Sequence, residues 1–394
     1  MTKQQIKNLA CELSAVSIFR EVIKTKQITA LLNFLQSSGD VTEKMMLFGE
    51  FVYLLSSDDY CFSDFLCRSV FADENRYVIS AAQNAEISDS VLQNAQSELK
   101  LFSYLTTVSA KGLCETLDYD GYIPSFDNKP IDFVKAYDER IKNINRFGYG
   151  IFSTANMFTV ENEDIIPVKS ADKISIDSFI GYEQERRQVF DNTKALIEGK
   201  TAANVLLFGD AGTGKSSTVK ACANYYANQG VRLIEIRKDQ LFSLSHIMGK
   251  IADNPLKFII FIDDLSFNKN DDCFSMLKAA LEGSASAKAK NAVIYATSNR
   301  RHIVKENFSD REGENDIHHS DTVQELMSLS DRFGLTVYFE RPNKSLYLDI
   351  IHQLADKNGI TINKAELDIK AEAFALQKGS RSPRAAEQFI NSLM

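Results

Sequence analysis

The residues of this 394-residue chain with the most distinctive chemistry lie between positions 209 and 217. Here the sequence reads Gly-Asp-Ala-Gly-Thr-Gly-Lys-Ser-Ser, directly after an apolar run at 205–208. Glycines at this spacing let the backbone curl so that successive N–H groups point at phosphate oxygens. The pattern predicts a nucleotide-binding loop made by Gly209, Asp210, Ala211, Gly212, Thr213, Gly214, Lys215, Ser216 and Ser217.

Two side chains of the predicted loop have separate tasks. Lys215 places a positive charge between the β- and γ-phosphates, and the Ser216 hydroxyl is a ligand for Mg²⁺. The helix that is expected to follow turns the positive end of its dipole toward the same anion. The sequence therefore predicts that the chain binds ATP with Mg²⁺.

A second apolar run, at 258–262, ends in Asp263 and Asp264. An uninterrupted apolar run of this length favours a central parallel strand, and an acid at its carboxyl end lies where such sites hold magnesium. We expect Asp263 to hold the metal and Asp264 to orient or deprotonate the attacking water. Taken alone, two acids after a strand are equally typical of a helix cap.

The elements that must position these residues follow from the alternation of patterns along the chain. Further strands are predicted at 292–296 and 335–339, and helical patterns at 274–282 and 323–329 fill the intervals. Strands that alternate with helices predict an α/β fold with a doubly wound parallel sheet. Functional residues are then expected at the carboxyl ends of the strands.

Taken together, these segments resemble the AAA+ superfamily of P-loop ATPases. Five motifs occur in the expected order over 176–390. The residues also resemble a bacterial domain-of-unknown-function family of predicted AAA+ ATPases, from about Ile176 to the C-terminus, with a further stretch at 149–168. This resemblance rests on the segments 205–217, 263–267, 295–302, 308–313 and 329–335.

The resemblance implies roles for two polar residues near the ends of strands. Asn299 falls where AAA+ proteins carry the polar sensor that hydrogen-bonds the γ-phosphate and the attacking water. Arg332 matches the arginine finger that reaches the nucleotide of a neighbouring subunit. Each residue has a simpler structural explanation, because Asn is common in turns and Arg is favourable at a helix end.

The resemblance also implies roles at either end of the matched region. Arg384 corresponds to the lid arginine called sensor 2, and Arg381 is its possible substitute. Ile180 and Gly181 resemble the segment that packs against the adenine base. These assignments complete a predicted ATP site.

Two departures from the wider superfamily bear on turnover. Most AAA+ motors have Asp-Glu where this chain has Asp263-Asp264, and the shorter acid reaches less far toward a water. The replication-initiator and helicase-loader branch also carries Asp-Asp, which implies slow or switch-like hydrolysis. The segment 234–242 lacks the aromatic-apolar-Gly loop of protein-threading unfoldases, so central-pore threading is not supported.

The sequence predicts four parts. Apolar residues recur three and four positions apart in the first 145 residues, for example at 18–35, and no proline occurs before Pro124. This spacing is typical of amphipathic helices, whereas prolines and glycines between 121 and 167 mark a joint. We expect a helical domain at 1–145, a connector with short strands at 146–175, the nucleotide-binding α/β domain at 176–341 and a helical lid at 342–394.

Composition limits the partners. The net charge of −8 argues against extended contact with DNA or RNA, although a local basic patch would override it. No apolar run is long enough to cross a bilayer and none resembles a signal peptide, so a cytoplasmic protein without membrane contact is expected. Scattered spacing predicts reduced, metal-free cysteines at Cys11, Cys61, Cys67, Cys114, Cys222 and Cys273.

Two functions remain open at this point. In the first, the chain is an ATP hydrolase that assembles head to tail and remodels a protein or nucleic-acid target held by the helical domain. In the second, it is a nucleotide-gated binding or scaffold module of the helicase-loader type, in which the ATP and ADP states differ in lid position and turnover is negligible.

Overall fold

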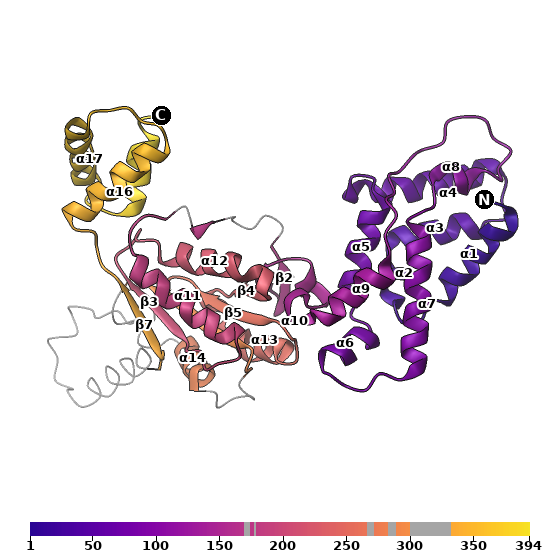
Figure 1. Cartoon of the computed structure of the whole chain (residues 1–394), viewed down its shortest axis with the longest axis horizontal. Helices are drawn as coiled ribbons and strands as arrows, with labels where there is room; N and C mark the ends of the chain where they lie inside the picture. The colour runs from indigo at the N-terminus through magenta and orange to yellow at the C-terminus, as the bar shows by residue number, and fades with distance from the viewer. Residues whose placement is uncertain (169–173, 177–178, 266–271, 283–288, 300–331) are drawn as a thin grey trace. The chain divides into compact units, whose positions relative to one another are not determined.

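The computed structural model describes residues 1–168, 174–176, 179–265, 272–282, 289–299 and 332–394 (Figure 1). The chain divides into two compact units, Met1–Thr154 and Ala155–Met394. The helix predicted at 323–329 lies outside the described residues. Among the described residues, no helix is both long and apolar enough to cross a membrane.

The first unit is built from helices, which short turns join except for the longer segment 115–132 between α8 and α9. Its helices are α1 (Lys3–Ala15), α2 (Arg20–Ile23), α3 (Lys26–Gln36), α4 (Val41–Leu54), α5 (Phe62–Ala72), α6 (Arg76–Ala82), α7 (Asp89–Leu105), α8 (Ala110–Cys114), α9 (Phe133–Lys142) and α10 (Ile144–Phe147), with 3-10 turns η1 (Leu55–Asp58) and η2 (Gly150–Ser153). The apolar stretch at 18–35 is two helices instead of one. The break occurs because the Thr25 hydroxyl accepts the N–H of Ile28 and so starts α3 anew.

Aromatic rings fill the core of the first unit. Phe19 meets the rings of Phe102 and Tyr137 edge to face, at centroid distances of 5.6 and 5.2 Å. These side chains come from the turn before α2, from α7 and from α9, so the core ties together segments far apart in the sequence. The apolar spacing of the first unit therefore supplies its interior.

A buried carboxylate fixes the turn before α2. Glu98 of α7 is 8% exposed and accepts the backbone N–H groups of Ser17, Ile18 and Phe19 at 2.7 to 3.1 Å. A buried charge is tolerated when several donors surround it, and here all of them come from one turn. Glu98 is accordingly a structural residue.

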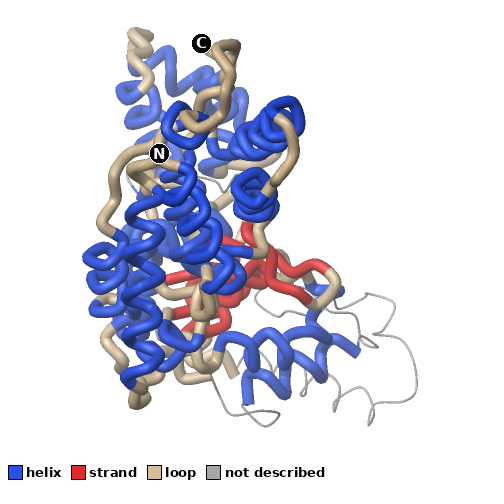
Figure 2. Tube along the Cα trace, turned by 90° about the vertical axis from the view of Figure 1, so that its right-hand side faces the viewer, coloured by secondary structure: helices blue, strands red, loops and turns tan. Residues whose placement is uncertain are grey.

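The second unit contains one sheet, whose strands are red in Figure 2. The strands are β1 (Met157–Glu161), β2 (Asp164–Pro167), β3 (Val205–Gly209), β4 (Val231–Glu235), β5 (Lys257–Ile262), β6 (Ala292–Ser298) and β7 (Leu335–Phe339). Their order is β2-β1-β4-β5-β6-β3-β7, and every neighbouring pair is parallel except β1 with β2. The predicted α/β fold with a parallel sheet is confirmed.

The order of the strands determines which face each helix covers. The helices are α11 (Glu183–Ile197), α12 (Lys215–Tyr226), α13 (Leu244–Ile251) and α14 (Asp272–Glu282), with 3-10 turns η4 (Ala227–Gln229) and η5 (Lys238–Ser243). The chain crosses from β3 outward to β4 through α12 and then returns through β5 to β6. Because parallel crossovers are right-handed, the reversal places α12 on one face and α13 and α14 on the other, as Figure 1 shows. The sheet is doubly wound, as predicted.

The strand pair at the edge of the sheet occupies the segment predicted as a connector. β1 pairs with β4 in parallel, and β2 folds back on β1 as an antiparallel hairpin. Gln240 of η5 donates a hydrogen bond of 2.8 Å to the carbonyl of Val160 and so fixes β1 from the side. The short strands therefore extend the parallel sheet.

Three helices form the C-terminal lid. They are α16 (Lys344–Lys357), α17 (Lys364–Lys378) and α18 (Pro383–Asn391). Local signals set their ends: Gly379 closes α17 at φ +68°, and the Ser382 hydroxyl accepts the N–H of Ala385 to start α18. A separate core around Tyr347 and Ile351 holds the three helices together.

A buried acid in the first unit predicts how stability depends on pH. Asp73 is 5% exposed, its Oδ2 has no hydrogen-bond partner among the described residues, and burial raises its pKa to about 6. The folded chain thus binds this proton more tightly than the unfolded chain does. The contribution of Asp73 to the free energy of unfolding therefore falls as pH rises from about 4 to about 6.

We expect Asp73→Asn, which cannot ionise, to raise the free energy of unfolding by about 1–2 kcal/mol above pH 6. The gain should shrink below pH 6 and vanish near pH 4. Urea unfolding of the full chain between pH 4 and 8 measures the free energy of unfolding of the variant and of the wild type. Asp120→Asn, at an exposed loop position, is the control and should leave the pH profile unchanged; a profile that Asp73→Asn also leaves unchanged contradicts the assignment.

Candidate functional site

The predicted loop joins the end of β3 to the start of α12. Gly209, Gly212 and Gly214 have φ of +137°, +78° and +91°, which residues other than glycine rarely adopt. At Gly209 a Cβ atom would stand 2.0 Å from the carbonyl oxygen of Phe339, so the neighbouring strand also requires glycine here. The Thr213 hydroxyl donates to the Asp210 carbonyl at 2.9 Å and closes the loop, with Ala211 at its exposed tip.

Lys215 lies inside the loop instead of at the surface. The side chain is 6% exposed, and its Nζ donates to the carbonyls of Gly209 and Asp210 at 2.8 and 2.7 Å. Burial lowers the pKa of Lys215, and the carboxylates of Asp210, Asp263 and Asp264 oppose this shift. Two carbonyl oxygens hold the ammonium in position, and three acids lie near it. The positive charge is therefore placed where an anion could bind.

Asp263, at the end of β5, holds a carboxylate oxygen fixed by three donors. Its Oδ1 accepts the hydroxyls of Ser216 at 2.6 Å and Thr297 at 2.5 Å, and the N–H of Asp264 at 3.1 Å. The two residues predicted as magnesium ligands, Ser216 and Asp263, are therefore in direct contact. Ser217 follows, half-buried in the first turn of α12.

Asn299 connects the loop to the second acid. Its Oδ1 accepts the ammonium of Lys215 at 3.1 Å, and its Nδ2 donates to Oδ1 of Asp264 at 2.9 Å. Asp264 has a left-handed backbone at φ +50°, and its N–H donates to the Thr297 hydroxyl at 2.9 Å. Three strands therefore bring Lys215, Asp264 and Asn299 to one place, the carboxyl edge of the sheet where the strand order reverses.

The lid approaches the loop through the start of α18. The Arg384 N–H donates to the Gly212 carbonyl at 3.3 Å, and the charge of Arg384 contributes to the lowered pKa of Lys215. Arg381, by contrast, forms a two-pronged ion pair with Glu372 of α17, at 2.9 and 2.7 Å. Of the two arginines considered for sensor 2, Arg384 contacts the loop through its backbone, and its assignment as sensor 2 stays a prediction.

The segment predicted to pack against adenine lies beside the lid. Ile180 packs against the lid core, and Gly181, at φ +74°, would bring a Cβ within 3.2 Å of Leu346 in α16. Tyr182 anchors the segment, because its hydroxyl donates to the Glu340 carbonyl at 2.6 Å, just after β7. This segment is therefore attached both to the sheet and to the lid.

Arg332 lies at the opposite edge of the sheet. It is exposed and precedes β7, which pairs in parallel with β3 from Val205↔Leu335 to Gly209↔Phe339. Four residue steps of about 3.3 Å separate the two ends of β3, so the start of β7 lies about 13 Å from the loop. The structure does not bring Arg332 together with the other predicted site residues of the same chain.

Thr297 is a residue of the site that was not predicted. It holds both Asp263 and the backbone of Asp264. A signal for it is present in the sequence, since alternate residues of a strand share one face and Thr297 stands two positions before Asn299. Tyr182 ends the segment expected to pack against adenine, but no local signal shows the contact of its hydroxyl, because the partner is 158 residues away.

These groups suit a magnesium–nucleotide complex. The loop offers backbone donors at positive φ, an ammonium, and a helix start at Lys215 whose N-cap Gly214 has no side chain to occupy the N–H groups. Ser216 and Asp263 offer two oxygen ligands of the kind that Mg²⁺ prefers. Together with the strand order, this site has the arrangement of the AAA+ class of P-loop proteins.

Within that class, the chain belongs to a family described as protein of unknown function (DUF815), whose model matches residues 153–394. The family match begins just before β1 and thus includes the edge hairpin, the sheet and the lid. No curated protein matches the chain.

Solved structures of RuvB from Thermotoga maritima show partial similarity. A point mutant of this RuvB is 16% identical, with a TM-score of 0.38, over 55% of this chain and 64% of that chain, less than two thirds of its length. A structure titled "Thermotoga maritima RuvB Holliday junction branch migration motor" is 14% identical, with a TM-score of 0.34, over 56% of this chain and 72% of that chain. The fold assignment depends on the strand order above.

The buried position of Lys215 makes Lys215→Met a sharp test, since methionine keeps the aliphatic stem and removes the charge. We expect ATP affinity to fall about 100-fold, because a charge-assisted contact contributes about 3 kcal/mol. Titration calorimetry with MgATP measures it. Lys220→Met is the matched control in the same helix, where Lys220 pairs with Glu235 at 3.0 Å; equal affinities for both variants would contradict the site.

Proposed function

We propose that this AAA+ protein binds MgATP and hydrolyses it slowly, as a head-to-tail oligomer that remodels a protein or nucleic-acid target. The observation that carries the proposal is the Asn299 side chain, which contacts both Lys215 and Asp264. One amide thereby connects the group suited to hold the γ-phosphate with the acid suited to handle the water. A site that only held nucleotide would not require this link.

The residues of the chain divide the chemistry among them. Lys215 and the loop N–H groups would hold the phosphates, and Asp264 would orient the water and accept its proton. Asn299 would sense the γ-phosphate while keeping Asp264 in place. Ser216 and Asp263 would hold Mg²⁺, which would supply positive charge to offset the charge developing on the phosphate oxygens.

The position of Arg332 supports an assembly of several subunits. Arg332 lies at the amino ends of the parallel strands, whereas the loop of the same chain lies at their carboxyl ends. Because β3 and β7 are parallel, the length of a strand separates the two. A role in catalysis therefore requires the loop of a neighbouring subunit. Such head-to-tail contacts are heterologous and close into rings or extend as filaments.

A second function is favoured by one contact. The Gly212 carbonyl in the loop accepts the N–H of Arg384. A Cβ atom at Gly212 would lie only 3.1 Å from the Ser382 hydroxyl, so the loop packs closely against the start of α18. A change at the loop is therefore transmitted directly to α18. This arrangement suits a nucleotide-gated switch, in which lid position reports the bound nucleotide and hydrolysis only resets it.

The two functions differ in how activity depends on assembly. ATPase rate and native mass, measured together across protein concentration with and without ATP, separate them. Turnover that rises with oligomer formation supports the remodelling ATPase. Tight nucleotide binding with negligible turnover at every concentration supports the switch.

The two acids are expected to give different defects. Asp264→Asn should keep MgATP affinity and slow hydrolysis about 100-fold or more, because the amide cannot accept the proton of the water. Asp263→Asn should weaken nucleotide binding only when Mg²⁺ is present. Affinities with Mg²⁺ and with EDTA, alongside phosphate release, distinguish them. Normal hydrolysis by Asp264→Asn would mean that another carboxylate acts on the water.

Mixing subunits tests Arg332. Arg332→Ala alone should bind ATP normally and lose about 10³-fold in turnover. Mixed with Lys215→Met, it should regain activity, because an intact loop then faces an intact arginine at some interfaces. Arg187→Ala, at an exposed arginine of α11, is the control and should be active alone. A mixture that stays inactive although native mass shows mixed oligomers would eliminate the trans-acting role.

A further inference from the structure

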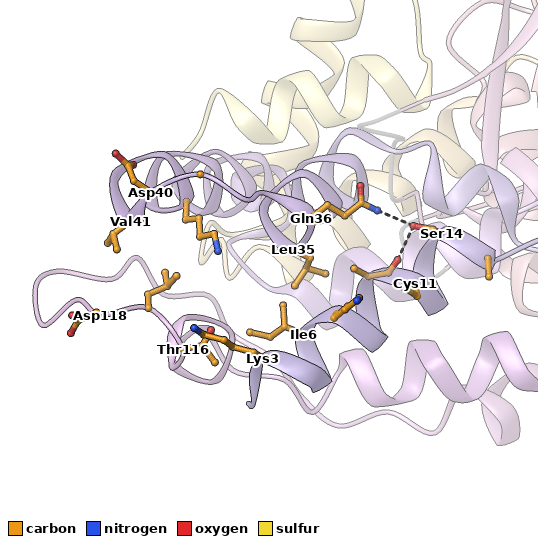
Figure 3. Close-up of a pocket in the computed structure, with 16 residues that line it drawn as sticks. Lys3, Ile6, Cys11, Ser14, Leu35, Gln36, Asp40, Val41, Thr116 and Asp118 are labelled. Atoms are coloured by element: carbon orange, nitrogen blue, oxygen red, sulfur yellow. Dashed lines mark hydrogen bonds between the residues drawn. The ribbon is translucent and has the colours of Figure 1, made fainter.

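A groove crosses the surface of the first unit, remote in sequence from the nucleotide site. It runs between α1, the end of α3, the start of α4 and the segment 116–118, and it encloses about 1130 Å³ (Figure 3). Its volume exceeds the usual range of small-molecule sites, about 300–1,000 Å³. The size suits a segment of protein.

The floor of the groove is apolar and supported from below. Ile6 of α1 lies opposite Leu35 of α3 (Figure 3), and Ala10, Val41 and Leu117 also line the groove. Ala10 and Leu35 belong to the core of the unit, at 5% and 7% exposure. The floor is thus the outer layer of a packed interior.

One end of the groove is fixed by hydrogen bonds. Gln36 Nε2 donates to the Ser14 hydroxyl at 3.0 Å, and this hydroxyl donates to the Ala10 carbonyl at 2.7 Å (Figure 3). The contact ties α3 to the last turn of α1. The groove is therefore preformed, which lowers the entropic cost of filling it.

The rim carries positive charge that is not used within the unit. Lys3, Lys7 and Lys44 line the groove, and none of them has a salt-bridge partner among the described residues. Elsewhere in the same unit Lys24 pairs with Glu21 and Lys142 with Asp138.

Two acids also line the groove, so its lining has three lysines against two aspartates and keeps a net positive charge. Asp40 caps α4, where it accepts the N–H of Glu43 at 2.9 Å, and Asp118 lies across the groove from it (Figure 3). Asp and Glu outnumber Lys and Arg over residues 1–154, so a rim of lysines is a local exception. Three lysines without acidic partners in the described part of the chain, beside an apolar floor, call for an occupant with the opposite charge.

We propose that this groove binds an acidic amphipathic helix of a partner protein. The apolar stripe of such a helix would cover the floor, and carboxylates flanking the stripe would meet Lys3, Lys7 and Lys44. The 13 residues of α1 rise about 20 Å, which matches three to four turns of a partner helix. The inference goes beyond the ATPase function and does not depend on it.

Nucleic acid fits the groove less well. Among the described residues that line it there is no aromatic side chain on which a base could stack. Apolar surface beside isolated lysines instead matches the helix-in-groove mode of protein recognition.

Selection from a displayed library of helical 14-residue peptides on the nucleotide-free full chain tests the proposal. We expect enrichment of peptides with Asp or Glu beside an apolar stripe. A synthetic copy should bind Lys3→Glu/Lys7→Glu at least about tenfold more weakly than wild type. Lys26→Glu/Lys100→Glu, which changes two exposed lysines of the same unit outside the groove, is the charge-matched control and should bind normally.

Cys11 reports whether the peptide lies in the groove, because it is an exposed free thiol that lines it. Mass spectrometry should show slower alkylation of Cys11 in the presence of the peptide. Failure to enrich acidic peptides, equal binding to both double variants, or unprotected Cys11 would overturn the proposal. So would lysine-dependent binding of labelled DNA without peptide binding. Lys215→Met should bind the peptide normally, which separates this result from the fate of the ATPase proposal.

Discussion

The position of β3 between β6 and β7 is the constraint on which the rest of the site depends. Backbone hydrogen bonds to both neighbours fix its register, so Gly209 ends level with Phe339 on one side and the loop opens beside Asn299 on the other. The same pairing leaves no room for a side chain at Gly209. It also separates Arg332 from the loop by the length of a strand. A single ladder thus positions the loop and keeps Arg332 away from it.

Some of this arrangement could be predicted from the sequence because its causes are local. Glycine spacing, apolar runs and strand-end acids act over a few residues, so the loop, four parallel strands and the meeting of Asp263 with Ser216 could be foreseen. Contacts made across the fold could not. The pairing of β1 with β4 and the burial of Lys215 depend on partners that no neighbouring residue reveals.

The lid and the sheet are coupled at two separate points. Arg384 contacts the loop itself, whereas Tyr182 and Gly181 connect the end of β7 to α16. Lid helices held only by a flexible tether would move without consequence for the nucleotide. With both attachments, a change in either the loop or the lid alters the surroundings of the other, and this suits either of the two proposed functions.

The left-handed backbone at Asp264 has a consequence for which acid can occupy that position. Asp and Asn enter this conformation more readily than longer side chains do, because a short polar group can bond to its own surroundings. A glutamate at position 264 would extend further, but it would adopt this left-handed backbone conformation less readily. The backbone at position 264 therefore limits which acid can stand there, and a glutamate would strain the turn that the Thr297 hydroxyl holds.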